Sequence, residues 1–334
     1  MANHKTPTMK DVAERACVSV ATVSRVINNE PSVSEFNRQA VLAAIEELHY
    51  ELKNTAQHKQ ELRVGLVIPD ITNPYFPLLI KGITALARVH DAEVVLCNAN
   101  GAFEAEKRHF MHLIDQGVDG IIYIPFLESV NPLVKDLVDR QFPIVFLDRE
   151  VNLKNICSVT SNNEEGAYQA TTYLLNLGHR DILFICGPPH FSTSISRLAG
   201  YRRGLEELGV PYREEMVVCA DTTQEGAYHL MQKFLERDEL PFTAVFASND
   251  LMAFGASQAL EEKGYRIPDD ISIVGYDDIP CSAMITLTTI AQPSYEIGSM
   301  AMILLVDLIN KRRQPPHRIV LRDSLIIRRS CRRI

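Results

Sequence analysis

Acidic, basic and amide side chains recur in this sequence directly after runs of apolar residues. The set after "PIVFL", "AVFAS" and "SIVGY" comprises Asp148, Arg149, Asn249, Asp250, Asp277 and Asp278. Carboxylates and guanidinium groups form strong, often paired hydrogen bonds, which suit the vicinal hydroxyls of a sugar. Any one of these residues could instead cap a helix or join a surface ion pair. Their common position after apolar runs in both halves of the chain favours a ligand pocket.

Other residues have the chemistry to join this pocket. Arg197 follows "FSTSIS", Gln292 lies in "TIAQP", and Tyr75 and Phe76 offer ring faces for stacking against a sugar ring. Catalysis has little support, because the sequence has no GxSxG elbow, Walker loop, GxGxxG fingerprint or HxxxH spacing after residue 62. We therefore expect binding rather than turnover, with no metal and no cofactor.

A second set of polar residues lies near the N-terminus, in "MKDVAERACVSVATVSRVINNEPSVSE" at residues 9–35. One face of the predicted helix over residues 20–28 carries hydroxyl, amide and guanidinium groups, on Ser19, Thr22, Ser24, Arg25 and Asn28. The polar face of such a helix could simply be exposed to solvent on a small helical domain. It could also read DNA, because arginine grips guanine in the major groove while hydroxyls and helix N-termini hold phosphates.

The flanking sequence predicts a compact helical unit that would position this polar helix. Thr8, with Asp11 three residues on, resembles a capping box, and Ser19 is a natural N-cap for the second helix. Ser34 would cap a third helix over residues 35–48. Three short helices in fifty residues, with a tight turn between the first two, predict a helix-turn-helix head at residues 1–50.

From Leu62 the chain alternates short apolar strands with amphipathic helices, and the same rhythm begins again at "HRDILFICGPP". This alternation predicts two doubly wound lobes with parallel sheets, whose ligands bind in the crevice outside the carboxyl ends of the strands. We expect a linker at residues 51–62 and a core at 63–334. The first lobe would hold residues 63–162 and 293–320, and the second 163–291 and 321–334.

Composition limits the kind of protein this can be. The chain has 334 residues, 46% of them hydrophobic, and a net charge of −8, so any contact with nucleic acid must be local. No apolar run is long enough for a membrane span, and "MANHKTPTMKD" has no secretory apolar segment. Seven cysteines without a CxxC pair predict buried thiols in a reducing cytoplasm, with neither a disulfide framework nor a zinc site.

The N-terminal stretch resembles the head of the lac repressor/galactose repressor family of bacterial transcription regulators. The matching segments there are "DVA", "VS" and "ATVSRVIN". The resemblance continues through "NPYF", "DGIIYIP", "PIVFLDR", "LGHRDILFICGP", "SRLAGYRRGL", "PFTAVFASNDLMAFG", "ISIVGYDDI" and "LTTIAQP". It covers nearly the whole chain and implies a helix-turn-helix head on a periplasmic-binding-protein-like core.

The resemblance also implies roles for the head. Val20, Ala21 and Arg25 would be the base-reading positions, and this Val-Ala pair is more similar to the galactose and ribose regulators than to the lac repressor. The complete set expected at DNA is Thr8, Ser19, Val20, Ala21, Thr22, Ser24, Arg25, Asn28 and Ser34. A homodimer is expected, because two heads must span two half-sites of a palindromic operator about one helical turn apart.

For the crevice, the resemblance implies a sugar site like that of the ribose regulators and the related periplasmic ribose-binding protein. The effector-binding set is then Asn73, Tyr75, Phe76, Asp148, Arg149, Arg197, Asn249, Asp277 and Gln292. Two positions depart from the ribose-binding protein: Ile124 stands where it has Asn, and Thr222 where it has Phe. Another pentose or hexose, or a glycoside, therefore fits as well as ribose.

The linker departs from the family pattern. Leu52 stands near the position of the usual Pro, and "AQHK" (56–59) replaces Ala-Arg-x-Leu, so the apolar side chain that would wedge into the minor groove is missing. Residues 1–62 also hold seven basic and eight acidic residues, which predicts weak non-specific DNA affinity because phosphate neutralisation supplies much of that affinity.

We therefore predict a cytoplasmic, sequence-specific repressor that senses a small carbohydrate. The main alternative is a purine-type regulator that needs a corepressor, although the Asp148–Arg149 pair favours hydroxyl recognition. A sugar-binding protein of transport is less consistent with the 50-residue head, and a glycoside-cleaving enzyme comes last.

Overall fold

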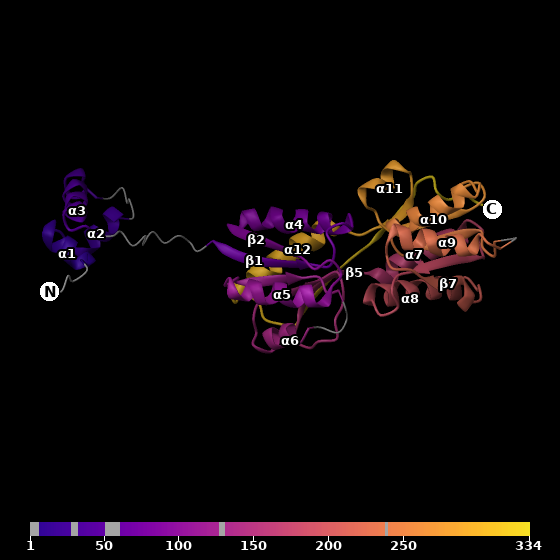
Figure 1. Ribbon diagram of the computed structural model, residues 1–334, viewed down its shortest axis with the longest axis horizontal. Coiled ribbons are helices and arrows are strands. Elements are labelled where there is room, and N and C mark those ends of the chain that lie inside the picture. The colour runs from indigo at the N-terminus through magenta and orange to yellow at the C-terminus, as the bar shows by residue number, and fades with distance from the viewer. Residues whose placement is uncertain (1–6, 28–32, 51–60, 127–130, 238–239) are drawn as a thin grey trace. The chain divides into compact units, whose positions relative to one another are not determined.

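The computed structural model describes residues 7–27, 33–50, 61–126, 131–237 and 240–334 (Figure 1). The chain divides into two compact units, residues 1–61 and 62–334. The expected helix residue Asn28 and the atypical linker segment, including Leu52 and "AQHK" at 56–59, lie outside the described residues.

The first unit is a small helical head formed by α1 (Met9–Arg15), α2 (Val20–Ile27) and α3 (Glu35–Glu47). Its core consists of small apolar side chains, which suits helices this short: Val12, Ala13, Val23, Val26, Val41 and Ala44. The predicted helix-turn-helix arrangement is confirmed, with α2 ending at Ile27 in the described part of the chain.

The three predicted helix starts are also confirmed. Thr8 and Asp11 form the reciprocal capping box before α1. The Ser19 hydroxyl accepts a hydrogen bond from the Thr22 amide at 3.1 Å. The Ser34 hydroxyl caps α3 in the same way, at 3.4 Å from an amide of its first turn. These bonds satisfy amides that a helix leaves unpaired at its start.

The second unit contains two six-stranded sheets. The first sheet has the order β11-β5-β4-β3-β1-β2 with every pair parallel. Its strands are β1 (Leu62–Ile68), β2 (Ala92–Asn98), β3 (Gly120–Tyr123), β4 (Ile144–Leu147), β5 (Cys157–Ser161) and β11 (His317–Leu321). On one face pack α4 (Tyr75–Val89) and α12 (Ser294–Ile309), and on the other α5 (Phe103–Asp115) and α6 (Pro132–Asp139).

The second sheet has the order β12-β10-β9-β8-β6-β7 and is parallel except for β12. Its strands are β6 (Ile182–Cys186), β7 (Val217–Cys219), β8 (Ala244–Ala247), β9 (Ser272–Asp277), β10 (Thr288–Ala291) and β12 (Ser324–Ile326). One face carries α9 (Gln224–Phe234) and α10 (Asp250–Glu262), and the other α7 (Asn163–Asn176) and α8 (Ser192–Glu207). The short η1 (Glu214–Met216) and α11 (Pro280–Met284) complete this lobe.

This architecture confirms the predicted α/β class of two doubly wound lobes. The chain passes between the sheets three times: from β5 to α7, from β10 to α12, and from β11 to β12. Each passage therefore lies where both lobes meet. None of the helices in the described ranges is both long and apolar enough to cross a membrane.

Glycines let the covering helices pack closely. A Cβ added to Gly82 of α4 would lie 2.1 Å from the Tyr295 carbonyl oxygen of α12, and one added to Gly298 of α12 would lie 2.1 Å from the Leu79 carbonyl oxygen. The two helices thus contact through their backbones, so a side chain at either glycine would force them apart.

Candidate functional site

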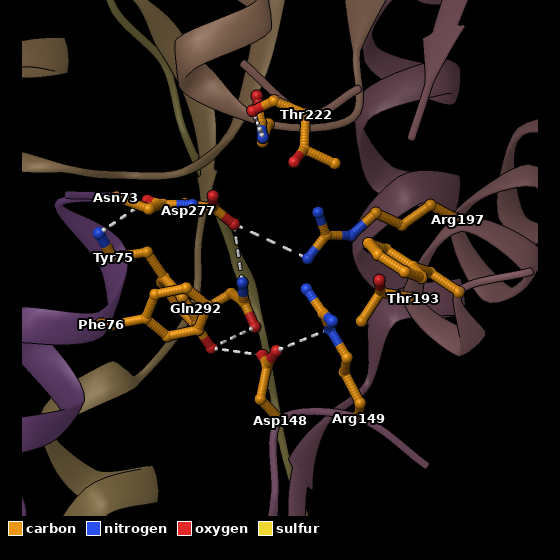
Figure 2. Close-up of a pocket in the computed structure, with 12 residues that line it drawn as sticks. Asn73, Tyr75, Phe76, Asp148, Arg149, Thr193, Arg197, Thr222, Asp277 and Gln292 are labelled. Carbon is orange, nitrogen blue, oxygen red and sulfur yellow. Dashed lines mark hydrogen bonds and ion pairs between the residues drawn. The ribbon is translucent and has the colours of Figure 1, made fainter. Parts of the chain in front are cut away.

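A pocket lies between the two lobes of the second unit (Figure 2). Its empty volume is about 390 Å³, including space open to solvent. Its lining comprises Asn73, Tyr75, Phe76, Asp148, Arg149, Phe191, Thr193, Arg197, Thr222, Asn249, Asp277 and Gln292. The structure thus brings together all nine residues that the sequence placed at an effector site.

The pocket is built from strand ends, as the doubly wound topology requires. Asp148 follows β4 and Asp277 ends β9, so the two carboxylates come from different sheets. Three lining residues other than glycine have a positive φ: Asp148 at 68°, Thr222 at 65° and Asp277 at 109°. Such backbone conformations cost energy and concentrate at ligand sites, where the surrounding structure holds them in place.

One hydrogen-bonded network joins the lobes across the pocket. The Tyr75 hydroxyl lies 2.8 Å from Asp148 Oδ1 and 3.1 Å from Gln292 Oε1. It has one hydrogen and therefore donates to one of these acceptors at a time. Gln292 donates through Nε2 to Asp277 Oδ1 at 2.7 Å and accepts from the Ser161 hydroxyl at 2.7 Å. Burial, reinforced by the Asp148 charge, raises the pKa of Tyr75, which keeps its phenol protonated as a donor.

Arg197 is held from several sides. Its Nε donates to Asn163 Oδ1 at 2.7 Å, and its Nη1 donates to the Ser248 carbonyl oxygen. Its Nη2 lies 3.6 Å from Asp277 Oδ1, the ion pair drawn in Figure 2. Burial by itself would lower the pKa of Arg197, but Asp277, Tyr276, Asp148 and Asp323 together more than offset this, so that the pKa is raised and the group stays charged.

Arg149 retains one buried donor without a hydrogen-bond partner in the described structure. Its Nη1 donates to the carbonyl oxygens of Pro125 at 2.8 Å and Phe126 at 3.0 Å. Its Nε has no hydrogen bond and lies 3.8 Å from Asp148 Oδ2. Burial lowers the pKa of this guanidinium, although Asp148 opposes the shift. Because an unpaired buried donor is costly, a ligand oxygen at this position would be strongly favoured.

The lobes also meet at the rim of the pocket. The Arg149 Cζ lies 4.1 Å from the centroid of the Phe191 ring, in cation–π geometry. The Glu150 amide donates to the Ser192 hydroxyl at 3.0 Å, and the Phe126 and Phe191 rings meet edge-on with centroids 6.0 Å apart. Phe191, Thr193 and Thr222 are lining residues that the sequence prediction did not include. Of these three, only Thr222 could have been found from the sequence, because it stands at a position where the ribose-binding protein has a Phe in its sugar site.

A smaller second cavity of about 220 Å³ adjoins the pocket, with which it shares Asp148 and Thr193. Its lining consists of two carboxylates, one amide and five hydroxyl groups, from Asp148, Glu150, Thr160, Ser161, Asn163, Ser192, Thr193 and Ser196. A lining of this kind accepts hydroxyl groups and disfavours anions.

Some strand-end polar residues have structural contacts. Asn249 caps α10, with its Oδ1 accepting from the Met252 amide at 2.7 Å, while its Nδ2 donates to the Thr222 carbonyl oxygen at 2.9 Å. Asp250 is fully buried and does not line the pocket; it accepts hydrogen bonds from Ile279, Ser282 and Thr289. Asp278 likewise lies outside the lining and pairs with Arg328 at 2.7 Å.

The head presents a separate candidate surface on α2. Val23 and Val26 are buried, whereas Val20, Ala21 and Arg25 are exposed on the opposite face. Val20 is 45% exposed. This surface carries small apolar side chains and an arginine, which are residue types that can read base edges in the major groove.

No group of His, Cys, Asp or Glu residues within the described ranges could hold a metal ion. A helix-turn-helix head joined to a two-lobed core with a polar pocket is the architecture of a ligand-responsive regulator of transcription.

The chain belongs to the lacI family of bacterial regulatory proteins. The model of that family matches residues 8–51, and the periplasmic binding protein-like domain matches residues 171–331. The chain is 37% identical to the ribose operon repressor of Halalkalibacterium halodurans, over 97% of each protein. It is 36% identical to the transcriptional repressor PurR of Edwardsiella ictaluri, over 97% of this chain and 96% of PurR. It is therefore a DNA-binding transcription regulator and not an enzyme, and the predicted family is confirmed.

Solved structures give the same result. The transcriptional regulator CelR in complex with cellobiose has a TM-score of 0.74 and 31% identity, over 97% of this chain and 99% of CelR. The lac repressor dimer bound to operator and the anti-inducer ONPF has a TM-score of 0.75 and 30% identity, over 98% and 99% of the two chains.

Proposed function

We propose that this regulator is a repressor whose affinity for operator DNA is controlled by a small neutral carbohydrate bound between the lobes. The observation that carries this proposal is the buried Arg149 Nε, which has no hydrogen-bond partner in the described structure and lies beside Asp148 in a pocket lined by acceptors and donors. A sugar hydroxyl can accept from Arg149 and donate to Asp148 at the same time.

The charges of the pocket favour a neutral ligand. Burial raises the pKa of Asp277, and the Arg197 charge opposes this shift. With both carboxylates ionised, Asp148 and Asp277 are balanced by Arg149 and Arg197, so the lining has no surplus charge for an ionic ligand. The adjoining cavity adds Glu150, whose charge would repel a phosphate substituent, and hydroxyl groups, which can pair with a hydroxymethyl group. Phe76 and Phe191 supply apolar faces for the sugar ring. A sugar or glycoside therefore suits this pocket better than a sugar phosphate.

In the head, we assign base reading to Val20, Ala21 and Arg25, which share the exposed face of α2. The capping hydroxyls of Thr8, Ser19 and Ser34 lie at helix N-termini, where phosphates bind. Thr22 and Ser24 would add hydroxyl contacts to the backbone of the DNA, and Asn28 is assigned there from the sequence only. A homodimer presents two such heads to a palindromic operator in the cytoplasm.

The two sites would be coupled by linkage. A sugar that binds better to one relative arrangement of the lobes shifts the population toward that arrangement, and operator DNA has its own preference between them. We propose induction: the sugar favours the arrangement that DNA disfavours. Gln292 and Ser161 lie on passages between the lobes and bind each other, so the pocket is in direct contact with the segments that must change.

The test is a thermal-shift screen of the purified full-length chain against pentoses, hexoses, their glycosides and phosphates, and purines. A ligand that binds only the folded state raises Tm by an amount that grows with the logarithm of its concentration relative to its Kd. We expect one or more neutral sugars to raise Tm while their phosphates do not. A shift by purines without any shift by sugars would instead make this a purine-responsive regulator.

A further inference from the structure

Two cysteines that are 33 residues apart in the sequence lie side by side in the second sheet. Cys186 is the last residue of β6 and Cys219 the last residue of β7, and the two are partners in the parallel register of these strands. We propose that this pair is a site of reversible oxidation, at which hydrogen peroxide or another hydroperoxide forms an intramolecular disulfide between Cys186 and Cys219.

The geometry of the sheet suits this bond. Paired residues on neighbouring parallel strands lie about 4.8 Å apart and point to the same face. A disulfide needs a Cα–Cα distance of about 4.4–6.8 Å. The Cys219 thiol is also close enough to Cys186 to help raise the pKa of the Cys186 thiol. The backbone spacing of the pair therefore lies within the range that a disulfide needs.

An oxidant can reach one of the two thiols more easily than the other, and this determines which cysteine is oxidised first. β7 is the edge strand of its sheet, and Cys219 is exposed, whereas Cys186 is 4% exposed. Burial raises the pKa of the Cys186 thiol, with the neighbouring Cys219 adding to the shift, so Cys186 remains protonated. Cys219 is therefore the thiol that meets the oxidant, and Cys186 is the one that resolves it.

The chemistry balances with one hydroperoxide. The Cys219 thiolate attacks a peroxide oxygen, the O–O bond breaks, and a sulfenic acid and hydroxide form. The Cys186 sulfur then attacks the sulfenic sulfur, the S–O bond breaks, and the hydroxide that leaves takes the thiol proton to give water. Both cysteines are oxidised, the peroxide is reduced, and a dithiol reverses the bond by exchange.

The pair is adjacent to the pocket. Gly187 follows Cys186, and a Cβ at Gly187 would lie 3.0 Å from the Thr222 Cγ2 atom, so the segments that follow the two strands are in contact. Thr222, three residues after Cys219, lines the pocket and accepts a hydrogen bond from Asn249. The disulfide would hold this segment against β6 and weaken ligand binding by restricting Thr222. This consequence rests on the proposed function, whereas formation of the disulfide does not.

Trypsin separates the two cysteines cleanly. Cleavage after Arg180 and Arg197 gives peptide 181–197 with Cys186, and cleavage after Arg213 and Lys233 gives peptide 214–233 with Cys219. We expect mass spectrometry of the peroxide-treated full-length chain to show these peptides crosslinked, with the loss of two hydrogen atoms, and dithiothreitol to release them. Cys219→Ser should abolish the crosslink, while Cys281→Ser, at another exposed cysteine, should leave it unchanged.

Two results would overturn the proposal. One is wild-type Cys219 oxidised to the sulfinic or sulfonic acid while peptide 181–197 stays unlinked. The other is a crosslink from Cys219 to a cysteine other than Cys186. In Cys186→Ser, the sulfenic acid on Cys219 should persist and react with dimedone. If the crosslink forms but the affinity for a sugar identified by the thermal-shift screen is unchanged, the link to Thr222 is wrong and the modification site stands.

Discussion

The guanidinium of Arg197 stacks on the ring of Tyr276, with Cζ 3.7 Å from the ring centroid. The Tyr276 hydroxyl in turn donates to the Asp323 carboxylate. Asp323 lies between β11 and β12, on one of the three passages between the lobes. A charged pocket residue is thus connected through Tyr276 to a segment that passes between the lobes.

Replacing Arg197 by Lys should weaken sugar binding sharply. A lysine keeps the charge but cannot reach Asn163, Ser248 and Asp277 with a planar fork, and hydrogen bonds of charged groups contribute about 1.5–3 kcal/mol each. Calorimetric titration should therefore show that Arg197→Lys binds the sugar tenfold or more weakly than the wild type. Arg203→Lys, on the same helix but in an exposed pair with Glu165, is the matched control and should bind normally. Equal affinities for both variants would contradict the assignment of Arg197.

Tyr75→Phe should reduce sugar affinity by a smaller amount. The substitution keeps the ring but removes the hydroxyl that lies 2.8 Å from the Asp148 carboxylate. A hydrogen bond to a charged group contributes about 1.5–3 kcal/mol, and sugar affinity should lose only the part of this that orients Asp148. The same titration should show a loss of about fivefold. Tyr295→Phe, at an exposed position, serves as the control. An unchanged affinity in Tyr75→Phe would show that the hydroxyl does not orient Asp148 toward a ligand.

Arg25→Ala should remove discrimination at one operator position. A side chain that grips a base edge contributes about 1–3 kcal/mol against the wrong base pair. Binding to an inverted-repeat operator should weaken, while binding to a version altered at the contacted base pair should not. Ser24→Ala, at a hydroxyl assigned to the DNA backbone, should instead weaken both sites equally. A variant that footprints like the wild type would refute base reading by α2.

Stability should depend on pH through Asp250. Burial raises the pKa of this carboxyl from 3.8 to about 6, although hydrogen bonds from Ser282, Thr289 and the Ile279 amide oppose the shift. The folded state therefore holds the proton more tightly, and its stabilisation is complete below about pH 4 and is lost as the pH rises through about 6. A shift of about two units corresponds to about 3 kcal/mol.

Urea unfolding at pH 4 and pH 7 checks this linkage. The free energy of unfolding should fall by about 3 kcal/mol more in the wild type than in Asp250→Asn, which has no proton to lose. The same decrease in both proteins would rule out Asp250 as its source.

Gly82→Ala should destabilise the first lobe. The new methyl group would meet the Tyr295 carbonyl oxygen at 2.1 Å, so α4 and α12 would have to separate. Overpacking of this kind costs about 1–3 kcal/mol, which thermal denaturation would detect as a lower Tm. Thr84→Ala, a half-buried position on the same helix, should change stability much less. A full-length variant as stable as the wild type would mean that the two helices can adjust freely.

Two signals predicted the pocket: polar residues at the carboxyl ends of parallel strands converge, and the resemblance to the family implied the nine-residue set. Asp148 and Asp277 obey the first, topological rule. Asp250 follows a strand as well, but its carboxylate turns into the lobe to pair with Ser282 and Thr289. Strand position places a residue at the right edge of a sheet and does not determine the direction of its side chain.

β5 and α7 were not predicted from the sequence. β5 reads "CSVTS", with three polar residues among five, yet all five are buried, because the strand lies inside the sheet between β4 and β11. Hydrophobic periodicity cannot detect such a strand. The Cys186–Cys219 pair was also not anticipated, since residues far apart in sequence become neighbours only through the register of β6 and β7.

The central claim is that a sugar bound in the pocket controls the affinity of the head for operator DNA. Fluorescence anisotropy of a labelled inverted-repeat operator, titrated with the full-length chain with and without a sugar identified by the thermal-shift screen, tests it most directly. We predict that the sugar raises the operator Kd several-fold in the wild type and has no effect on an Asp148→Ala variant that still binds the operator. Identical operator affinity with and without a sugar that demonstrably binds the wild-type pocket would contradict the claim.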